Sequence, residues 1–460
     1  MGKFIMKRRK SHFSARAPLV ALGLKTQQMG LFRTVGKHVK IQQKVIRYTP
    51  LNKLQDAYIA ILAGAKGLVE SNKRVRPDRN VQRAFGRSGC AEQSVLSDTL
   101  NACTAENVMQ MEAAMKEILQ QHSRAYGHRY EKLLQLLDVD MSGMPCGKKA
   151  AFATKGYFAK QRNRRGRQLG RVLATHYQEI VVDRLYDGKT QLPRVFQELV
   201  TRAEEVLGLD EEKRRRTILR MDGHGGSQDD VNWALERGYQ LHTKEYSGDR
   251  ARTLAETAEV WHEDPKVPGR EVGWVTAAPS EYVRPVKRVA VRTRKKNGQW
   301  GIGVLISTLS DEEAILLARL PIDRLNDPLA VLLAYVYFYD LRAGGVETEI
   351  KEDKQGLGIN KRNKKRFEAQ QMLGQLNALA HNLIVWAREW LTPAWQRLKH
   401  YGMLRMVRDV FPICGLVHYD REDHIRKIVL NEWDPLAPPL CAGLQTLLAP
   451  LHVDVNLGQI

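Results

Sequence analysis

The pattern of apolar and polar positions divides the chain into a helical first part, an α/β middle part and a mixed final part. From residue 48 onward, apolar residues recur at three- and four-residue steps, which predicts helices as far as residue 125. Short apolar and β-branched runs follow and predict strands. In chain order these strands are 133–140, 170–184, 217–222 and 239–246. A helix expected at 228–237, with Ser227 as its N-cap, completes the pattern of an α/β fold.

The second half of the chain changes character. Residues 255–320 combine Pro-rich turns with β-branched runs, and 286–308 predicts a hairpin that turns at Lys296-Asn297-Gly298. Further helices are expected at 311–318 and 328–340 and, as a long amphipathic helix, at 366–391. For the last 65 residues we expect a small ribbon and a Pro/Leu-rich tail.

Together these elements predict a multi-domain α/β protein. A chain of 460 residues has room for several domains, each with its own apolar core. The expected segments are a basic N-terminal arm (1–50), a helical region (51–130), the first part of a core (131–254), a β-rich insertion (255–325), the second part of the core (326–395) and a C-terminal region (396–460).

The charge of the chain indicates a polyanionic partner. The formal net charge is +22, and residues 1–50 hold twelve Lys or Arg and no acidic residue. A cationic segment of this kind is typical of nucleic-acid binding, although a solvated tail that only aids solubility is the plainer alternative. Four more basic clusters favour a DNA track: 160–167, 213–216, 292–296 and 361–366.

A helix–turn–helix pattern in the helical region offers one place for DNA contact. Its helices are expected at 79–86 and 91–103, with the turn at 86–89. Such a unit can place its second helix in the major groove. We therefore name its arginines as candidate phosphate contacts, while a plain helical bundle remains the alternative. These residues are Arg79, Arg83 and Arg87.

Several classes of protein are disfavoured. The five cysteines lack C-x-x-C spacing and matching histidine pairs, so neither a zinc site nor a disulfide framework is expected. No apolar run approaches the length of about 20 residues that a membrane span needs. The N-terminus has no continuous apolar segment of the signal-peptide type. We expect a cytoplasmic, DNA-associated protein without a membrane partner.

Two aspartates stand at the ends of predicted strands. Asp140 closes 133–140, and Asp222 closes 217–222. Because strand residues alternate between faces, Asp138 and Asp140 share a face and are rivals for one role. Functional groups of α/β sheets often lie past the carboxyl ends of strands, which favours Asp140 and Asp222. Most isolated strand-end aspartates are only caps or turn residues, and the short Asp-x-Asp pattern also occurs in nucleotide-sugar transferases.

A later polar run supplies a third carboxylate. Tyr339 and Arg342 share a helix face, and Glu347 and Lys354 lie two turns apart on the next one. Glu349 and Glu352 are the alternatives to Glu347. Three such carboxylates are suitable ligands for hard divalent cations, and a cationic chain suits a polyanionic substrate. The combination predicts a metal-dependent enzyme that cuts and joins DNA.

The same residues carry a family resemblance. The run resembles the Tyr-x2-Arg-x3-Glu-x6-Lys motif of cut-and-paste bacterial insertion-sequence transposases of the DDE class. It contains Tyr339-x2-Arg342, then Glu347 and, after six more residues, Lys354. One extra residue falls at 343–346, where a glycine pair can absorb it as a bulge. The sequences at 138–143 and 219–223 resemble that group's two aspartate strands. The resemblance covers about residues 130–395, and the helical region loosely.

The resemblance implies an RNase H-like catalytic core, interrupted by the β-rich insertion, with an α-helical N-terminal DNA-binding region. Asp140, Asp222 and Glu347 would bind two Mg²⁺ ions, for which Mn²⁺ is expected to substitute. The partner would be double-stranded DNA, both the terminal repeats of the element and its target, bound by a homodimer. The implied DNA contacts are Tyr339, Arg342, Lys354 and Trp300.

Trp300 would hold a flipped base in a hairpin route, although a tryptophan packed on its sheet is the plainer interpretation. Two other functions remain open at this point. One is a DNA-binding repressor or decayed transposase without activity, and the other is a metal-dependent nuclease that cuts without joining.

Overall fold

The computed structural model describes residues 11–156, 158, 161, 163–223, 227–279 and 281–460. Residues 224–226 of the turn expected at 223–226, and part of the basic cluster at 160–167, therefore lie outside the described residues. The chain forms two compact units. The first contains the residues up to 118, residues 149–151 and those from 351 onward, and the second contains 119–148 and 152–350.

The first unit is built mainly from helices. They include α1 (Ala17–Met29), α2 (Leu31–His38), α3 (Pro50–Leu62), α4 (Ser71–Arg74), α5 (Arg79–Ala84), α6 (Gln93–Ala102), most of α7 (Ala105–His122), α15 (Phe367–Leu391) and α17 (Ala437–Leu448). The start of α3 shows why they form where they do. The Thr49 side chain accepts a hydrogen bond from the Asn52 backbone, and Pro50 supplies the fixed φ of a first turn. The predicted helices of this region are confirmed.

The central helix of the first unit differs from its prediction. The sequence predicts an amphipathic helix, but α15 is buried along almost its whole length. Helices α3, α6 and α17 pack around it, so its polar residues also lie inside. They are paired there: the Asn377 side chain accepts from Arg362, and His381 Nδ1 lies 2.8 Å from Asp353 Oδ1.

The two ends of the described chain meet in a four-stranded sheet of the same unit. Its order is β1 (Ser11–Ser14), β12 (Gly415–Tyr419), β13 (Ile425–Asn431) and β14 (Asp454–Gly458). The expected C-terminal ribbon is confirmed as β12 and β13, while the expected tail forms α17 and the parallel strand β14. The expected basic arm contains β1 and two helices, and residues 17–22 of α1 are buried.

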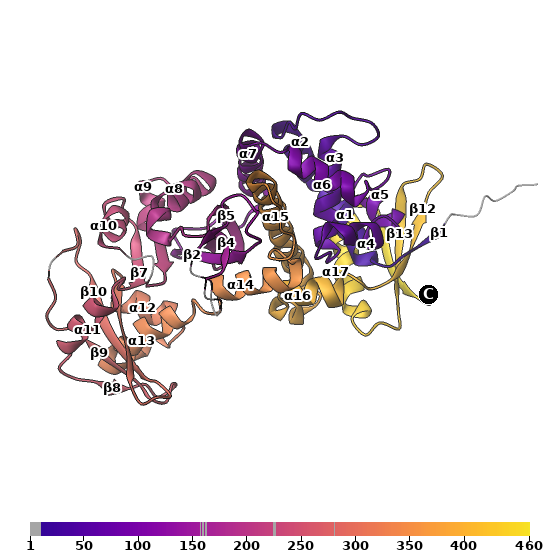
Figure 1. The fold of residues 1–460 in the computed structure, drawn as a ribbon. Coiled ribbons are helices and arrows are strands. Elements are labelled where there is room, and N and C mark those ends of the chain that lie inside the picture. The colour runs from indigo at the N-terminus through magenta and orange to yellow at the C-terminus, as the bar shows by residue number, and fades with distance from the viewer. Residues whose placement is uncertain (1–10, 157, 159–160, 162, 224–226, 280) are drawn as a thin grey trace, which may run out of the picture. The chain divides into compact units, whose positions relative to one another are not determined.

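The second unit is built on one mixed sheet (Figure 1). Its strands are β2 (Gln135–Pro145), β3 (Thr154–Lys155), β4 (Arg165–Ala174), β5 (Glu179–Asp187), β6 (Thr217–Met221), β7 (Gln240–Lys244), β8 (His262–Glu263), β9 (Arg270–Trp274), β10 (Lys287–Arg294) and β11 (Trp300–Ser307). The order is β3-β4-β2-β6-β7-β11-β10-β9-β8, and β5 pairs with β4. Strands β2, β6 and β7 are parallel, whereas β4 and β11 run antiparallel to their neighbours.

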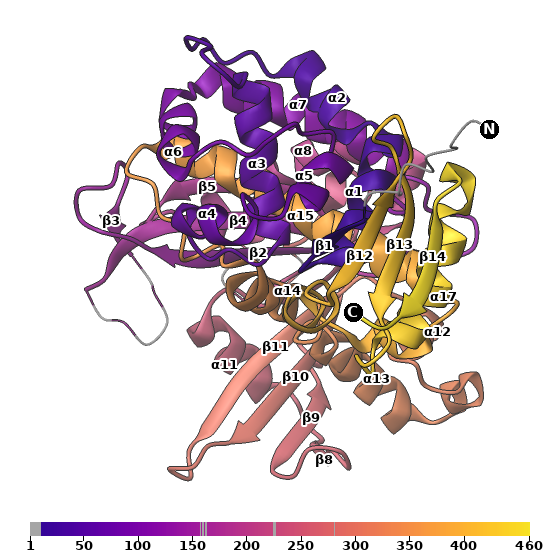
Figure 2. The same cartoon turned by 90° about the vertical axis from the view of Figure 1, so that its right-hand side faces the viewer.

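One strand prediction needs correction. The stretch 170–184 is a hairpin, because residues 175–178 turn between β4 and β5, with Gln178 at a φ of 57°. None of those four residues is Gly, Pro or Asn, so the sequence carries no usual turn signal. The β-rich segment 255–325 continues the main sheet, since β11 pairs with β7, and Figure 2 shows β11, β10 and β9 side by side.

Helices cover both faces of this sheet. On one face α8 (Phe196–Leu207) and α10 (Gln228–Glu236) pack on the odd-numbered residues of β2, Leu137 and Val139. On the other face α12 (Asp311–Leu317) and α13 (Pro328–Asp340) pack with Leu134 and Leu136. The remaining helices are α9 (Glu211–Arg215), α11 (Gly248–Glu256) and α14 (Val346–Glu352). The polar residues of β2, Asp138 and Asp140, therefore belong to the α13 face.

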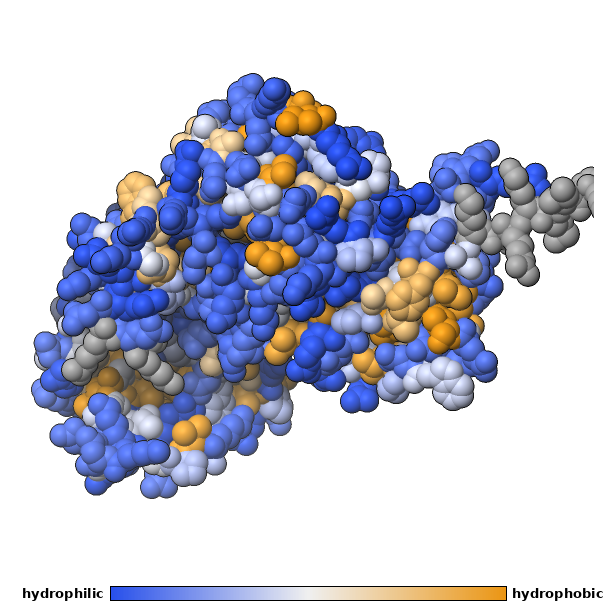
Figure 3. All heavy atoms as spheres, turned by 45° about the vertical axis from the view of Figure 1, so that its right-hand side comes forward, coloured by the Kyte–Doolittle hydropathy of each residue, from blue (hydrophilic) through white to orange (hydrophobic). Residues whose placement is uncertain are grey.

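The surface is mainly polar. Hydrophilic residues cover most of the face drawn in Figure 3, and hydrophobic residues are interspersed among them. Within the described ranges, every helix is too short or too polar to cross a membrane.

A buried histidine beneath α13 gives the second unit a pH dependence. His242 is fully buried, and its Nε2 lies 3.0 Å from the Tyr335 carbonyl oxygen, to which Nε2–H donates. Burial, with the nearby charge of Arg220, lowers the pKa of His242 to about 3. In the unfolded chain the pKa of a histidine is about 6.5. Below that pH the histidine is protonated in the unfolded state but stays neutral in the folded state.

We therefore predict that the free energy of unfolding falls on acidification below about pH 6.5, by about 1.4 kcal/mol per pH unit from this residue alone. His242→Gln keeps a donor for Tyr335 and should remove that part of the slope. Chemical unfolding of both proteins between about pH 4.5 and 7.5 measures it. Equal slopes in the two proteins would contradict the assignment.

Candidate active site

The three carboxylates predicted from sequence meet at one edge of the second unit's sheet. Asp222 directly follows β6, and Asp140 lies two residues beyond Asp138, the last β2 residue paired with β6. Strand β2 continues to Pro145 beside β4, so Asp140 marks the separation of β2 from β6 rather than a strand end. Glu347 comes from the first turn of α14.

The three groups influence one another electrostatically, as the pKa of Asp140 shows. Burial raises the pKa of Asp140 to about 6, and the negative charges of Asp222 and Glu347 add to the rise. Arg342 and a hydrogen bond from the Met141 backbone act against it. A buried carboxylate whose pKa is raised by neighbouring negative charges favours a cation beside it.

Arg342 supplies one cation to this group. Its Nη1 donates to Glu347 Oε1 at 2.9 Å, and its Nη2 lies 3.3 Å from Asp140 Oδ2. The Arg342 side chain is only 3% exposed, compared with 14% for Asp140 and 55% for Glu347. Burial opposes the charge of Arg342, but the neighbouring carboxylates outweigh it and raise its pKa.

Arg220 distinguishes the surroundings of Asp138 from those of Asp140. Asp138 is fully buried and accepts two hydrogen bonds from Arg220, from Nε at 2.7 Å and from Nη2 at 2.9 Å. The third donor, Arg220 Nη1, is bonded to the Phe338 carbonyl oxygen at 2.8 Å. Asp138 is thus already neutralised, and Asp140 is the carboxylate left for the site.

A glycine brings Glu347 to the sheet. Between α13 and α14 the chain turns at 341–345, where the motif has its extra residue. A Cβ on Gly345 would lie 2.7 Å from Asp138 Oδ2 and 3.1 Å from a Thr175 methyl group. Since Asp138 is held by Arg220, only glycine permits this approach.

Two further side chains join the site. The Tyr339 hydroxyl donates to the Met221 carbonyl oxygen at 3.4 Å, and Lys244 Nζ lies 4.8 Å from the centre of the Tyr339 ring. Burial and the charge of Arg342 lower the pKa of Lys244, while Asp340, Asp222 and Glu347 oppose that shift. Sequence analysis missed Lys244. The feature that could have indicated Lys244 is its position at the end of β7, the parallel neighbour of β6.

The alternatives to Glu347 lie elsewhere. Glu349 is buried and accepts a hydrogen bond from Gln178 at 2.8 Å. Glu352 accepts a hydrogen bond from the Leu404 backbone within the first unit. Lys354 also belongs to the first unit, in the π-helical turn Asp353–Leu357.

Trp300 packs against its own sheet. It begins β11, and the guanidinium groups of Arg292 and Arg294 lie 4.8 and 5.1 Å from the centre of its ring. This is the plainer of its two expected roles.

The arginines of the helix–turn–helix pattern have different surroundings. Arg79 and Arg83 are exposed on α5, and Arg83 lies 3.8 Å from Asp423. Arg87 is 4% exposed and donates to both oxygens of Asp56, at 2.8 and 3.1 Å. A guanidinium that is buried and paired in this way is not available to DNA, which argues against the expected phosphate contact at Arg87.

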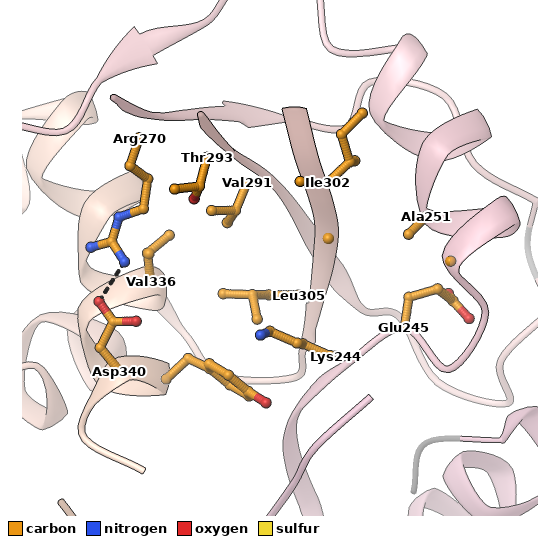
Figure 4. A pocket seen from close by; sticks show the side chains of 14 residues that line it. Lys244, Glu245, Ala251, Arg270, Val291, Thr293, Ile302, Leu305, Val336 and Asp340 are labelled. Carbon is orange, nitrogen blue, oxygen red and sulfur yellow. Dashed lines mark hydrogen bonds and ion pairs between the residues drawn. The ribbon is translucent and has the colours of Figure 1, made fainter. Parts of the chain in front are cut away.

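A cavity of about 340 Å³ adjoins the site. Lys244 and Tyr339 contribute to its wall, together with apolar residues of β10 and β11, Val291, Ile302 and Leu305. In Figure 4 the paired Arg270 and Asp340 bound one side, and Glu245 and Ala251 lie on the other. Lys244 thus takes part in both the cavity and the carboxylate group.

The donor chemistry of the site fits a hard divalent metal ion. Its potential ligands are carboxylate oxygens, the type that Mg²⁺ prefers, and their mutual repulsion favours a cation. Within the described ranges, no three His, Cys, Asp or Glu side chains are already arranged to hold a metal. The Arg342 guanidinium instead contacts two of the three carboxylates.

Comparison with known proteins gives a similarity among solved structures. No family model matches the sequence, and no curated protein matches it. Among solved structures, the chain is similar to the piggyBac transposase in a cryo-EM structure of its synaptic complex with hairpin DNA. The identity is 11% and the TM-score 0.44, over 87% of this chain and 81% of that one.

The close approach of Gly345 gives a prediction with a matched control. Gly345→Ala should lower the free energy of unfolding by about 1–3 kcal/mol, because the added methyl group meets Asp138. Gly344→Ala should change it by less than about 0.5 kcal/mol, since its nearest neighbour is 3.6 Å away. The two variants share the same effect on the unfolded chain, so chemical unfolding of both isolates the contact. Equal losses would refute the packing argument.

Proposed function

We propose that the protein is a DNA transposase of the DDE class, which cleaves DNA at the ends of an insertion sequence and joins them to target DNA. The observation that supports this proposal is that Asp140, Asp222 and Glu347 lie at one edge of the sheet. Two basic side chains, Lys244 and Arg342, lie beside them. An RNase H-like core is part of the proposal. Strands β5, β4, β2, β6 and β7, with helices on both faces, would form it.

Asp140, Asp222 and Glu347 would hold two Mg²⁺ ions. Such ions, when bound, supply Lewis-acid stabilisation of the attacking and leaving oxygens. The chain's own residues do the rest. Lys244 and Arg342 would bind phosphate oxygens, and the Tyr339 hydroxyl would position the substrate beside Met221.

The proposed reaction consists of two displacements at phosphorus. Water first attacks a phosphodiester at the element end, and the bond to the 3′ oxygen breaks, leaving a 3′-hydroxyl and a 5′-phosphate. That hydroxyl then attacks a second phosphodiester, in the opposite strand or in target DNA, and displaces another 3′ oxygen. The number of phosphodiester bonds is conserved in the second step, so joining requires no nucleotide cofactor.

The hairpin route of this reaction requires a site for a base that has left the stack. The cavity beside Lys244 suits this role better than Trp300 does. Its wall is apolar along β10 and β11, and its volume of about 340 Å³ can take a nucleobase. The Trp300 ring, by contrast, already lies against two arginines.

DNA binding would extend beyond the catalytic edge. The helices of the first unit carry exposed Arg79 and Arg83 and much of the basic N-terminal segment, so they are proposed to hold the element end. Coordinated cutting at two ends requires two active sites, which is the reason for proposing a homodimer. A bacterial cytoplasm is the expected location.

The central prediction concerns the carboxylates. Asp222→Ala and Glu347→Ala should each reduce Mg²⁺-dependent cleavage by at least about 1,000-fold, because a metal ligand is lost, while DNA affinity stays within about threefold. The assay uses the full chain and a labelled duplex carrying the inverted repeat that flanks the gene. Asp229→Asn, which changes an exposed carboxylate at the start of α10, is the control and should cleave normally.

The products distinguish the candidate functions. Cleavage followed by joining of pre-cut ends to a plasmid supports a transposase. Cleavage without joining supports a nuclease, and specific DNA binding without cleavage by the natural protein supports a repressor or decayed enzyme.

A second prediction concerns the exposed arginines. Arg79→Ala and Arg83→Ala should each weaken DNA binding and lower the slope of log affinity against log salt by about 1, as expected for a lost phosphate contact. Arg324→Ala removes an exposed arginine that is paired with Asp327 and serves as a charge-matched control.

Arg87→Ala should instead lower the free energy of unfolding by about 3–5 kcal/mol, since it leaves Asp56 buried and unpaired. Fluorescence anisotropy and chemical unfolding measure the two effects, and unchanged salt slopes would contradict the DNA role.

A further inference from the structure

We propose that Arg342 is the resident counter-ion of the carboxylate site, that it competes with the divalent metal for Asp140 and Glu347, and that a DNA phosphate releases it. Metal loading and DNA binding would then be coupled. The inference rests on the proposed function and specifies how the same site is regulated.

The first argument is the position of the guanidinium. It contacts Glu347 at 2.9 Å and Asp140 at 3.3 Å, both of which are proposed metal ligands. A metal bound to the same oxygens would lie beside the positive guanidinium. Because the Arg342 side chain is only 3% exposed, water would screen the repulsion between the two cations poorly. Arg342 in this position therefore disfavours the metal.

The second argument is that Arg342 has unused hydrogen-bonding capacity. Its Nε is buried and makes no hydrogen bond within the described part of the chain, and its Nη2 is held only by the longer ion pair with Asp140. Buried donors without acceptors are costly, so an acceptor that reaches them gains binding energy. The planar fork of arginine matches the oxygens of a phosphate, and phosphate is the anion that a DNA substrate brings.

The third argument is the charge of the whole group. Three carboxylates with Arg342 and Lys244 carry a single net negative charge, since Asp138 is neutralised by Arg220. Two divalent ions would leave this partly buried group strongly positive unless anions enter with them. DNA phosphates can restore the balance, so each partner should strengthen the binding of the other.

The test is to measure Mn²⁺ affinity of the full chain by electron paramagnetic resonance, with and without the inverted-repeat duplex. For the natural protein we expect the duplex to raise Mn²⁺ affinity about tenfold and, by linkage, saturating Mn²⁺ to raise duplex affinity by the same factor. Arg342→Gln should raise Mn²⁺ affinity without DNA about tenfold and leave less than a twofold effect of the duplex. Arg342→Lys keeps the charge and should remain close to the natural protein without DNA.

Three results decide the question. If Arg342→Gln has a normal melting temperature and binds Mn²⁺ no more tightly than the natural protein, the counter-ion role is refuted. If that variant does not fold, the natural protein alone decides, because a duplex without effect on its Mn²⁺ affinity also refutes the role. Asp222→Ala separates the two proposals: Mn²⁺ binding that persists in this variant overturns the proposed function itself, whatever Arg342 does.

Discussion

The buried ion pair between Asp138 and Arg220 is the interaction on which the candidate site depends. Arg220 uses Nε and Nη2 on Asp138 of the neighbouring strand and Nη1 on the Phe338 carbonyl oxygen of α13. It thereby joins β2, β6 and the helix that leads to Glu347. A fully buried charge is tolerated only when it is paired and its donors are satisfied. This requirement fixes the register of the three elements that carry the carboxylates, so the pair positions the site without belonging to it.

Much of the fold follows from local sequence, and the rest from pairings that local sequence does not encode. The strand that ends before Asp222 and the long helix α15 were predicted because their apolar runs are strong and continuous. The hairpin β4–β5 was missed because residues 175–178 turn without a typical turn residue. The pairing of β11 with β7 was also not predicted, because it joins segments some 60 residues distant in sequence.

The candidate site shows the same division. Spacing and strand ends pointed to Asp140, Asp222 and Glu347. The partners of Asp138 and Asp140, Arg220 and Arg342, are visible only in the structure, and they support the preference for Asp140. Arg87 looked like a phosphate contact because its pattern resembles a recognition unit, and its burial with Asp56 depends on a residue in another helix. Lys244 carries no motif at all. Its role depends on strand order, which brings β7 beside β6.

The division of the chain between the two units has a consequence for how the protein is made. The second unit is almost continuous in sequence, whereas the first combines the N-terminal helices with the residues from 351 onward. Helices α3 and α6 pack on α15, and β1 pairs with β12. During synthesis the basic helices leave the ribosome long before their core partner exists. The second unit can fold in the meantime, and the first unit is completed only near the end of translation.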